Sequence, residues 1–260
     1  MLFRSLTYES WRVIACSHFM SEQIQDYFET PADKIDVVPN GVRVQPKPFH
    51  SEREQTEFRR QFVQKRTPLV FYVGRLVYEK GVHVLIEAWP HVLAAEPNAH
   101  LIIAGTGSEL DRIRQRASDL ELNVSITFTG FISDTDRDRL YRVSNVAAFP
   151  SLYEPFGIVA LEAMAAGCPV VVASSGGLSE VVKLHETGIT VYPNDASSLA
   201  WGIVHTLQHP KWAKRRAENA LSEVRALFDW TTIAEATAAI YERTVADWRR
   251  AGWGENGVIP

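Results

Sequence analysis

The sequence predicts an α/β fold with a doubly wound, mostly parallel sheet. Short runs rich in Val, Ile and Leu alternate regularly with longer amphipathic segments. The apolar runs are nearly continuous, which is typical of strands that helices cover on both faces. From Ser197 onward the pattern contains helical segments with no intervening strand, and this predicts a helical C-terminal tail.

The elements follow one another in a regular order. Apolar runs predict strands at 12–16, 35–39, 69–74, 99–105, 124–130, 145–150, 169–173 and 188–192. Helical spacing of the apolar residues predicts helices between them at 17–28, 81–95, 108–119, 134–142, 157–166 and 177–183. The tail is predicted as three helices at 197–208, 210–227 and 231–250. A strand followed by a helix and then a parallel strand implies right-handed crossovers.

The first strand and helix stand apart from the rest. Residues 12–39 resemble the last βα unit of a preceding sheet, and a Pro-, Asn- and Gly-rich stretch at 39–52 reads as a linker. A complete α/β cycle begins only at Leu69. We therefore divide the chain into a domain remnant with its linker (1–45), a Rossmann-like domain (46–250) and a flexible tail (251–260).

Composition excludes several classes of function. The 260 residues carry a formal net charge of −4, whereas a nucleic-acid-binding domain normally presents a basic face. The two cysteines, Cys16 and Cys168, lie singly in or beside apolar runs, which favours a reducing compartment. No signal peptide is apparent, and no apolar run approaches the roughly 18 residues that span a membrane. We expect a cytoplasmic protein; membrane association is not indicated and stays open.

Two cations follow the strand that is predicted to end at Gly74. Arg75 and Lys80 precede a helix that begins near Gly81. Ligands of open α/β sheets gather at the carboxyl ends of strands, so this pair could bind a pyrophosphate beside the helix N-terminus. The alternative is a basic loop in contact with solvent or with Glu79. Spacing alone leaves both readings open.

The glycine pair after the next strand does not complete a nucleotide motif. Gly105 and Gly107 form a GxG sequence, but Leu110 stands where a dinucleotide fingerprint needs a third small residue. No P-loop sequence occurs either. We interpret the glycines as a tight turn at a helix N-terminus. Whether a ligand lies close to this turn stays open.

Two glutamates lie in a stretch that otherwise reads as buried core. Pro155 disfavours helical backbone at Glu154, which can therefore project from a loop over the strand ends. Glu162 lies more than a turn into the next helix among small apolar residues. Burying an unpaired carboxylate is costly, so either each glutamate has a protein partner or both face a ligand. Glu180, in the first turn of a later helix, reads as a capping residue in preference to a ligand contact.

In order, these motifs resemble the C-terminal domain of the retaining glycosyltransferases with the GT-B fold, specifically family 4, including glycogen-synthase-like members. The matching motifs are VPNGV (38–42), VGRLVYEKG (73–81), AGTGSE (104–109), FTGFIS (128–133), PSLYEPFGIVALEAMAAGCPVV (150–171), GGLSEVV (176–182) and TGITVYP (187–193). The resemblance extends from about residue 11 to the final helix. Only the last βα unit of the family's N-terminal domain is matched, so the catalytic groups of that domain have no counterpart here.

The resemblance implies roles for four charged residues. Arg75 and Lys80 match the pair that binds the donor diphosphate, and Glu162 matches the glutamate that binds the ribose hydroxyls. Glu154 matches the glutamate that contacts the transferred sugar, so Arg75, Lys80 and Glu154 form the candidate catalytic set. We expect polar ligand and solvent in a cleft, not protein partners, to keep both glutamates charged.

The remaining implied donor contacts come from strand ends and from one loop-to-helix junction. In the family, apolar residues after one strand pack the nucleobase, and backbone at a helix start meets the sugar and phosphates. The corresponding residues are Gly74, Gly105, Phe131, Ile132, Phe156, Gly157, Ile158 and Val159. Histidines show no metal-ligand spacing, and His18 is the only one considered for function, without an assigned role.

The resemblance implies a retaining hexosyl transfer from a nucleotide-diphosphate sugar to an acceptor, with a sugar or an α-glucan as the expected acceptor. No cofactor and no metal ion are expected. The expected partners are the donor, the acceptor and the missing N-terminal domain, in the same or another chain, and no nucleic acid. Two alternatives stay open: a non-catalytic nucleotide-sugar-binding module that needs a separate acceptor-domain partner, and a GT-B nucleotide-sugar epimerase.

Overall fold

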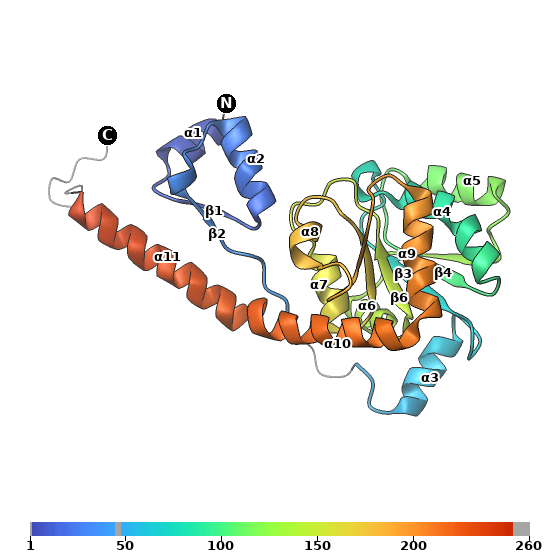
Figure 1. The fold of residues 1–260 in the computed structure, drawn as a ribbon. Coiled ribbons are helices and arrows are strands. Elements are labelled where there is room, and N and C mark those ends of the chain that lie inside the picture. The colour runs from blue at the N-terminus through green and yellow to red at the C-terminus, as the bar shows by residue number, and fades with distance from the viewer. Residues whose placement is uncertain (1, 45–47, 252–260) are drawn as a thin grey trace.

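A six-stranded parallel sheet forms the centre of the protein, seen in a computed structural model that describes residues 2–44 and 48–251 (Figure 1). Its strands are β3 (Leu69–Val73), β4 (His100–Ala104), β5 (Ile126–Gly130), β6 (Val146–Phe149), β7 (Val170–Ala173) and β8 (Ile189–Val191). They lie in the order β5-β4-β3-β6-β7-β8, and each neighbouring pair is parallel. The predicted doubly wound sheet is confirmed.

Helices cover both faces of this sheet, which explains the unbroken apolar runs. Successive strand residues point to opposite faces: Leu69 and Phe71 pack in one cluster, while Val70 and Tyr72 pack in the other. The first cluster is covered by α6 (Asp134–Val143), α7 (Ile158–Ala165), α8 (Leu178–Val181) and α10 (Pro210–Leu227). The second is covered by α4 (Val82–Ala95), α5 (Leu110–Asp119) and α9 (Ala196–Gln208).

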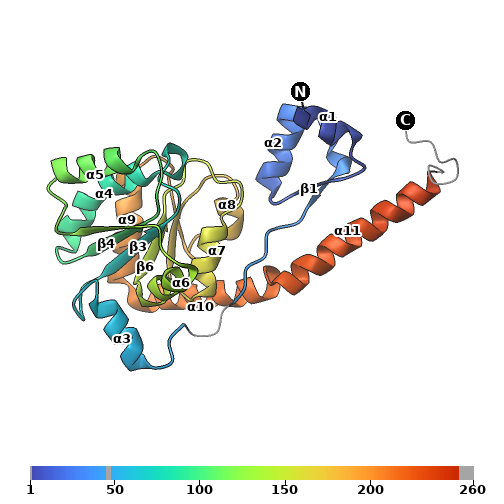
Figure 2. The same ribbon diagram turned by 180° about the vertical axis from the view of Figure 1, so that it is seen from behind.

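The N-terminal residues form a small separate unit, visible from both sides in Figures 1 and 2. It consists of α1 (Leu2–Glu9), β1 (Val13–Ala15), α2 (His18–Phe28), a 3-10 turn (Ala32–Lys34) and β2 (Ile35–Val37). β1 pairs only with β2, in parallel, within the described residues. The predicted strands and the helix at 17–28 are present; α1 was not predicted.

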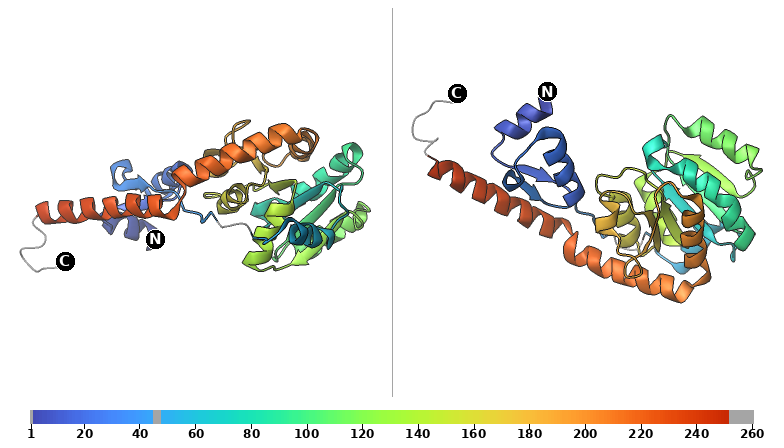
Figure 3. Two further views of the ribbon diagram at one scale, coloured as in Figure 1. Left: turned by 90° about the horizontal axis from the view of Figure 1, so that it is seen from below. Right: turned by 45° about the horizontal axis from the view of Figure 1, so that its top comes forward.

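The last helix, α11 (Trp230–Arg250), connects the two parts of the molecule. Asp229 is its N-cap, whose side chain accepts a hydrogen bond from the Thr231 N–H, and the helix runs from the end of α10 beside the N-terminal unit (Figure 3). Ile233 and Ile240 pack with Val38, which follows β2. The three predicted tail helices are confirmed as α9, α10 and α11.

One helix was missed in the segment between the linker and the large sheet. α3 (Glu52–Arg60) begins after Ser51, whose hydroxyl accepts the Glu54 N–H at 3.1 Å. Phe58 is its only buried residue and packs against Phe49. A helix with one buried residue gives no periodic apolar signal, so the sequence did not reveal it.

Residues 45–47 and most of the predicted flexible tail, from residue 252, lie outside the described residues. Within the described part of the chain, no helix combines the length and the apolar character needed to cross a bilayer.

Candidate functional site

The chain reverses its direction of winding between β3 and β6. From β3 it adds β4 and β5 on one side, then returns to place β6 on the other side of β3. In open α/β sheets, ligands bind in the crevice that opens at the carboxyl ends of strands at such a point. The loop after β3 carries Gly74, Arg75 and Lys80, and the loop after β6 carries Glu154. Four predicted site residues therefore lie at the switch point.

Hydrogen bonds to main-chain carbonyl groups hold the loop after β6 in place. The Leu152 N–H donates to the Glu79 carbonyl at 2.8 Å, which joins this loop to the one after β3. The Ser175 hydroxyl donates to the Ser151 carbonyl at 2.6 Å, and the Gly177 N–H donates to the Glu154 carbonyl at 2.9 Å. These bonds attach the same loop to the segment after β7, so the position of Glu154 depends on both neighbouring strands.

Two of the predicted site glycines are required by close packing. Gly105 has φ +130°, and a Cβ there would overlap the carbonyl oxygen of Gly74. Gly157 has φ +111° at the start of α7, and a Cβ there would lie 2.7 Å from the Leu178 Cδ2 atom. Side chains at these positions would separate loops that meet at the strand ends, since L-residues avoid this backbone region.

Lys80 and Glu154 form an ion pair. The Lys80 Nζ donates to Glu154 Oε2 at 2.7 Å, and the Ser151 hydroxyl donates to the same oxygen at 3.2 Å. The side chains are 19% and 9% exposed. The expectation that Glu154 has no protein partner is therefore wrong. Lys80 lies in a 3-10 turn (Tyr78–Lys80) before α4, and this turn directs its amine towards the neighbouring loop.

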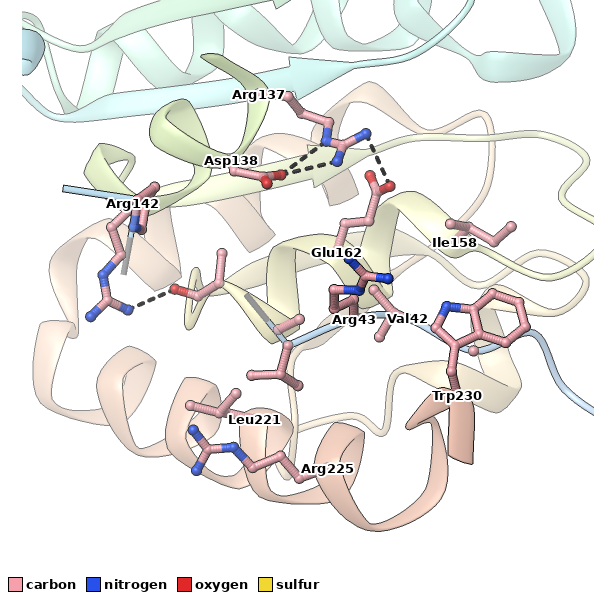
Figure 4. A pocket seen from close by; sticks show the side chains of 15 residues that line it. Val42, Arg43, Arg137, Asp138, Arg142, Ile158, Glu162, Leu221, Arg225 and Trp230 are labelled. Atoms are coloured by element: carbon pink, nitrogen blue, oxygen red, sulfur yellow. Dashed lines mark hydrogen bonds and ion pairs between the residues drawn. The ribbon is translucent and has the colours of Figure 1, made fainter. Parts of the chain in front are cut away.

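Glu162 is also paired, through an arginine that the sequence did not indicate. Arg137 Nη1 lies 3.2 Å from Glu162 Oε1 and 3.0 Å from an Asp134 oxygen, while Nη2 binds Asp138 (Figure 4). The Tyr141 hydroxyl lies 3.5 Å from Glu162 Oε2. Burial raises the pKa of Glu162 above its ordinary value, against the opposing charge of Arg137. The expectation that Glu162 has no protein partner is therefore also wrong.

Arg75 does not join these pairs. Its side chain is 72% exposed, and its guanidinium lies 3.6 Å from Glu79, which was one of the two readings left open. Within the described part of the chain, the guanidinium is therefore held only by an exposed ion pair, which contributes little to stability. Its place in the loop between β3 and Lys80 keeps it beside the switch point.

The apolar site residues divide into exposed and buried ones. Phe131 follows β5 with 84% of its surface exposed, whereas Ile132 packs against the core. The ring of Phe156 is buried and lies 6.2 Å from that of Phe228, so only its backbone can face a ligand. Ile158 is exposed on the first turn of α7, and Val159 packs against the core.

A pocket of about 610 Å³ lies beside Glu162 (Figure 4). Ile158 and Glu162 line it from α7, and Arg137 and Arg142 line it from α6. The linker contributes Arg43, and the α10–α11 junction contributes Arg225 and Trp230. The pocket can accept an anionic or a planar group. The sequence marked Ile158 and Glu162 but not the lining from α6, the linker and the α10–α11 junction, because these segments meet α7 only in the folded chain.

The N-terminal unit contacts the loop that carries Glu154. The Ser17 hydroxyl donates to the Pro155 carbonyl at 2.6 Å and also accepts the Met20 N–H. The Glu180 carboxylate accepts the N–H groups of His18 and Phe19 at 2.9 and 2.8 Å. Glu180 lies in the first turn of α8 as expected, but it caps α2. The unit is thereby attached next to the candidate site.

This contact leads to a test of Glu180. Replacing it with glutamine should destabilise the first turn of α2 by about 1 kcal/mol, because a neutral amide is a weaker acceptor for the helix N-terminus. Amide hydrogen exchange should become several times faster at His18 and Phe19, whose N–H groups bind Glu180. Glu186→Gln makes the same charge change on an exposed residue and should leave these rates unaltered. Equal acceleration in both variants would contradict the capping role.

No group of three metal-ligating side chains occurs within the residues that the structure covers, 2–44 and 48–251.

Sequence comparison adds an independent line of information. Residues 54–223 match the profile of the family Glycosyl transferases group 1, and residues 1–45 match Glycosyltransferase Family 4. An uncharacterized glycosyltransferase of Methanocaldococcus jannaschii is 40% identical over 240 residues, which cover 91% of this chain and 61% of that protein. Glycogen synthase of Mycobacterium tuberculosis is 37% identical over 236 residues, 91% of this chain and 55% of that protein. The chain thus spans little more than half the length of these relatives.

Solved structures share the fold. Sucrose-phosphate synthase from Thermosynechococcus elongatus superposes with a TM-score of 0.82 at 31% identity, over 94% of this chain and 61% of that one. Anabaena HepE, solved in complex with UDP and glucose, superposes with a TM-score of 0.84 at 26% identity, over 93% of this chain and 66% of that one.

Proposed function

The chain belongs to the glycosyl transferases group 1, and on that premise we propose that it binds a nucleotide-diphosphate sugar at the carboxyl ends of β3 and β6 for transfer of the sugar with retention of configuration. The observation that carries the proposal is the meeting of Lys80 and Glu154 at the switch point of the sheet. A cation and a carboxylate at this place offer a phosphate ligand and a hydroxyl ligand side by side.

The ion pairs suggest how the site accepts its ligand. A diphosphate that approaches Lys80 supplies a stronger negative charge than Glu154, so the amine can exchange one partner for the other. Glu154 is then free to accept hydrogen bonds from the hydroxyls of the sugar. Arg75, which is exposed and held only by Glu79, can turn to the diphosphate as well. The two cations then stabilise the charge that develops on the departing nucleoside diphosphate, with no metal ion required.

Glu162 is proposed to bind the ribose. Its side chain, on α7 four residues after the exposed Ile158, is only 18% exposed, and its carboxylate is held by Arg137. A carboxylate in a fixed orientation can accept both hydroxyls of a ribose, each in a charge-assisted hydrogen bond. We place the nucleobase near Phe131 and Ile132, at the end of β5, and the sugar and phosphates against the backbone of residues 156–159.

The similarity to HepE, which was solved with UDP and glucose, supports a UDP-sugar as the donor. The similarity to a glycogen synthase and to a sucrose-phosphate synthase supports a sugar or an α-glucan as the acceptor. The acceptor-binding groups are proposed to lie in a region that corresponds to the part of these relatives beyond the matched residues.

Titration calorimetry tests the proposal directly. We expect UDP-glucose to bind the chain with one site per molecule and more tightly than ADP-glucose or GDP-glucose. Gly157→Ala should weaken binding at least tenfold, because the added Cβ forces the loop-to-helix backbone away from its φ of +111°. Absence of binding by all three nucleotide sugars would refute the proposal.

A further inference from the structure

α9 and α10 meet at a corner of the molecule (Figure 1), and the second turn of α10 carries an arginine that has no partner among the described residues. Arg216, on α10, is only 5% exposed. Its Nη2 atom is fully enclosed and has no hydrogen-bond partner among the described residues, and no ion pair to Arg216 occurs there. Burial lowers the pKa of this guanidinium from its ordinary value, yet an arginine stays protonated in proteins. A buried cation of this kind lacks a compensating negative charge.

Two polar side chains on the same side of α10 as Arg216 already have other partners. Arg216, Asn219 and Glu223 lie on one stripe of the helix, since they are spaced by three and four residues. The Asn219 amide donates to the Glu186 carbonyl at 3.1 Å, and Glu223 pairs with Lys183 at 2.9 Å. The stripe therefore packs against the loop that precedes β8. The acid of that loop, Glu186, is exposed, and its carboxylate makes no ion pair with Arg216 among the described residues.

Three histidines surround the same corner. His205 of α9 has ring centroids 4.5 Å from His209 and 6.4 Å from His185, which lies in the loop before β8. The Nε2 atom of His205 is also enclosed without a partner. Burial and the neighbouring charges of His209, Arg216 and His185 lower the pKa of His205, which favours the neutral ring. In the tautomer with hydrogen on Nε2, this ring adds a second donor without an acceptor.

Two exposed tryptophans flank the histidines. Trp201 stacks on His205 at 5.2 Å, and Trp212 stacks on His209 at 4.9 Å with the planes 11° apart. Trp201 and Trp212 are each more than half exposed. Exposed aromatic groups gathered beside unsatisfied polar groups are typical of a ligand site, in which the rings contact the carbon skeleton and the polar groups orient it. A metal site is not indicated, because no cluster of three metal-ligating side chains occurs in the described residues.

We propose that the α9–α10 corner binds a small oxyanion, the phosphate or carboxylate group of a metabolite, with Arg216 as its main ligand and the rings of Trp201 and Trp212 against its carbon skeleton. The planar guanidinium presents two parallel N–H groups that match two oxygens of either anion. The corner lies at the amino ends of the strands, because α9 runs back from the carboxyl end of β8 and the loop at 183–188 leads into β8. It is therefore separate from the candidate donor site at the carboxyl ends.

Chemical-shift mapping of the isotopically labelled chain provides the test. Inorganic phosphate and acetate are titrated at constant ionic strength against sodium chloride. We expect saturable shifts in the amides of the loop 183–188 and of the residues around His205 and Arg216 with at least one of the two anions and not with chloride. A larger response to phosphate than to acetate would identify a phosphate site, and the reverse a carboxylate site.

Two arginine variants sharpen the test. Arg216→Met should lower the affinity for the anion about tenfold or more, which is the loss expected when a charge-assisted pair of hydrogen bonds is removed. Arg215→Met is the matched control, because it makes the same charge change one residue earlier on an exposed position of α10. It should alter the affinity less than twofold. Arg216→Lys retains the positive charge but lacks the planar guanidinium, and its affinity for the anion should lie between those of the two methionine variants.

The result does not depend on donor binding, because no nucleotide sugar is present in the titration. Should Arg216→Met fail to fold, the map on the unaltered chain and the His205→Gln variant still decide the matter. Absence of saturable shifts at the corner, shifts confined to the loops after β3 and β6, or equal weakening by Arg215→Met and Arg216→Met would each overturn the proposal.

Discussion

Replacing Lys80 with methionine is expected to lower the free energy of unfolding by about 3 kcal/mol. The substitution retains much of the aliphatic chain but leaves the Glu154 carboxylate, which is 9% exposed, with only the Ser151 hydroxyl as a partner. Removing one member of an enclosed ion pair costs about 3–5 kcal/mol, because the other charge remains where water cannot solvate it. We take the lower end, since the Lys80 side chain is 19% exposed. Denaturant unfolding measures the change.

A second substitution in the same chain separates charge from packing. Glu154→Gln in the Lys80→Met background should restore most of the lost stability, because a neutral amide at this place needs no counter-charge. Arg75→Met is the matched control: it removes a cation from the same loop, but an exposed one. Its effect on stability should stay below about 1 kcal/mol. If Arg75→Met destabilises the protein as much as Lys80→Met, the enclosed pair has no special role.

Replacing Glu162 with glutamine should reduce the affinity for UDP-glucose about 100-fold or more. Under the proposed function this carboxylate accepts two ribose hydroxyls, and each charge-assisted hydrogen bond contributes roughly 1.5–3 kcal/mol. Asp134→Asn is the matched control. Asp134 binds the same Arg137 at 3.0 Å and undergoes the same change of charge, but its side chain is 87% exposed and does not line the pocket beside Glu162. We expect it to alter the affinity less than about threefold.

Comparison of UDP with UDP-glucose distinguishes the two glutamates. Both ligands contain ribose, so Glu162→Gln should lower the affinity for UDP and the affinity for UDP-glucose to the same degree. Glu154 is proposed to contact only the sugar, so Glu154→Gln should lower the affinity for UDP-glucose. The affinity for UDP should stay the same or rise, because Lys80 is then released for the diphosphate. Calorimetry with UDP and with UDP-glucose measures, for each variant, the ratio of its dissociation constant to that of the unaltered chain. Loss of UDP binding in the Glu154 variant alone would reverse the proposed assignment.

The elements of the fold could be predicted from the sequence because their signals are local. All eight predicted strands are present in the described residues, and the helices that cover the large sheet begin and end within about two residues of their expected limits. A strand buried on both faces has to be apolar along its whole length, as Val170–Ala173 is, whatever its neighbours are. α3 escaped prediction because Phe58 is its only buried residue.

The sequence also located the strand ends where the candidate site lies, through Gly74, Arg75, Lys80 and the stretch from Glu154 to Glu162. It left open whether the glutamates face protein or ligand, and the resemblance to a family then led to the wrong expectation that they have no protein partners. Lys80 and Glu154 are 74 residues apart in the chain, and only the order of the strands brings their loops together.

The sequence by itself therefore determined the α/β alternation, the position of each strand end and the charged residues found there. Tertiary structure alone decided that Lys80 neutralises Glu154, that Arg137 neutralises Glu162 and that Glu180 caps a helix of the N-terminal unit. It also decided that Arg216 has no partner among the residues that the structure describes. The physical reason is the range of the interactions. Backbone conformation and amphipathic spacing depend on residues within a few positions, whereas the partner of a buried charge depends on which loops and helices meet in space.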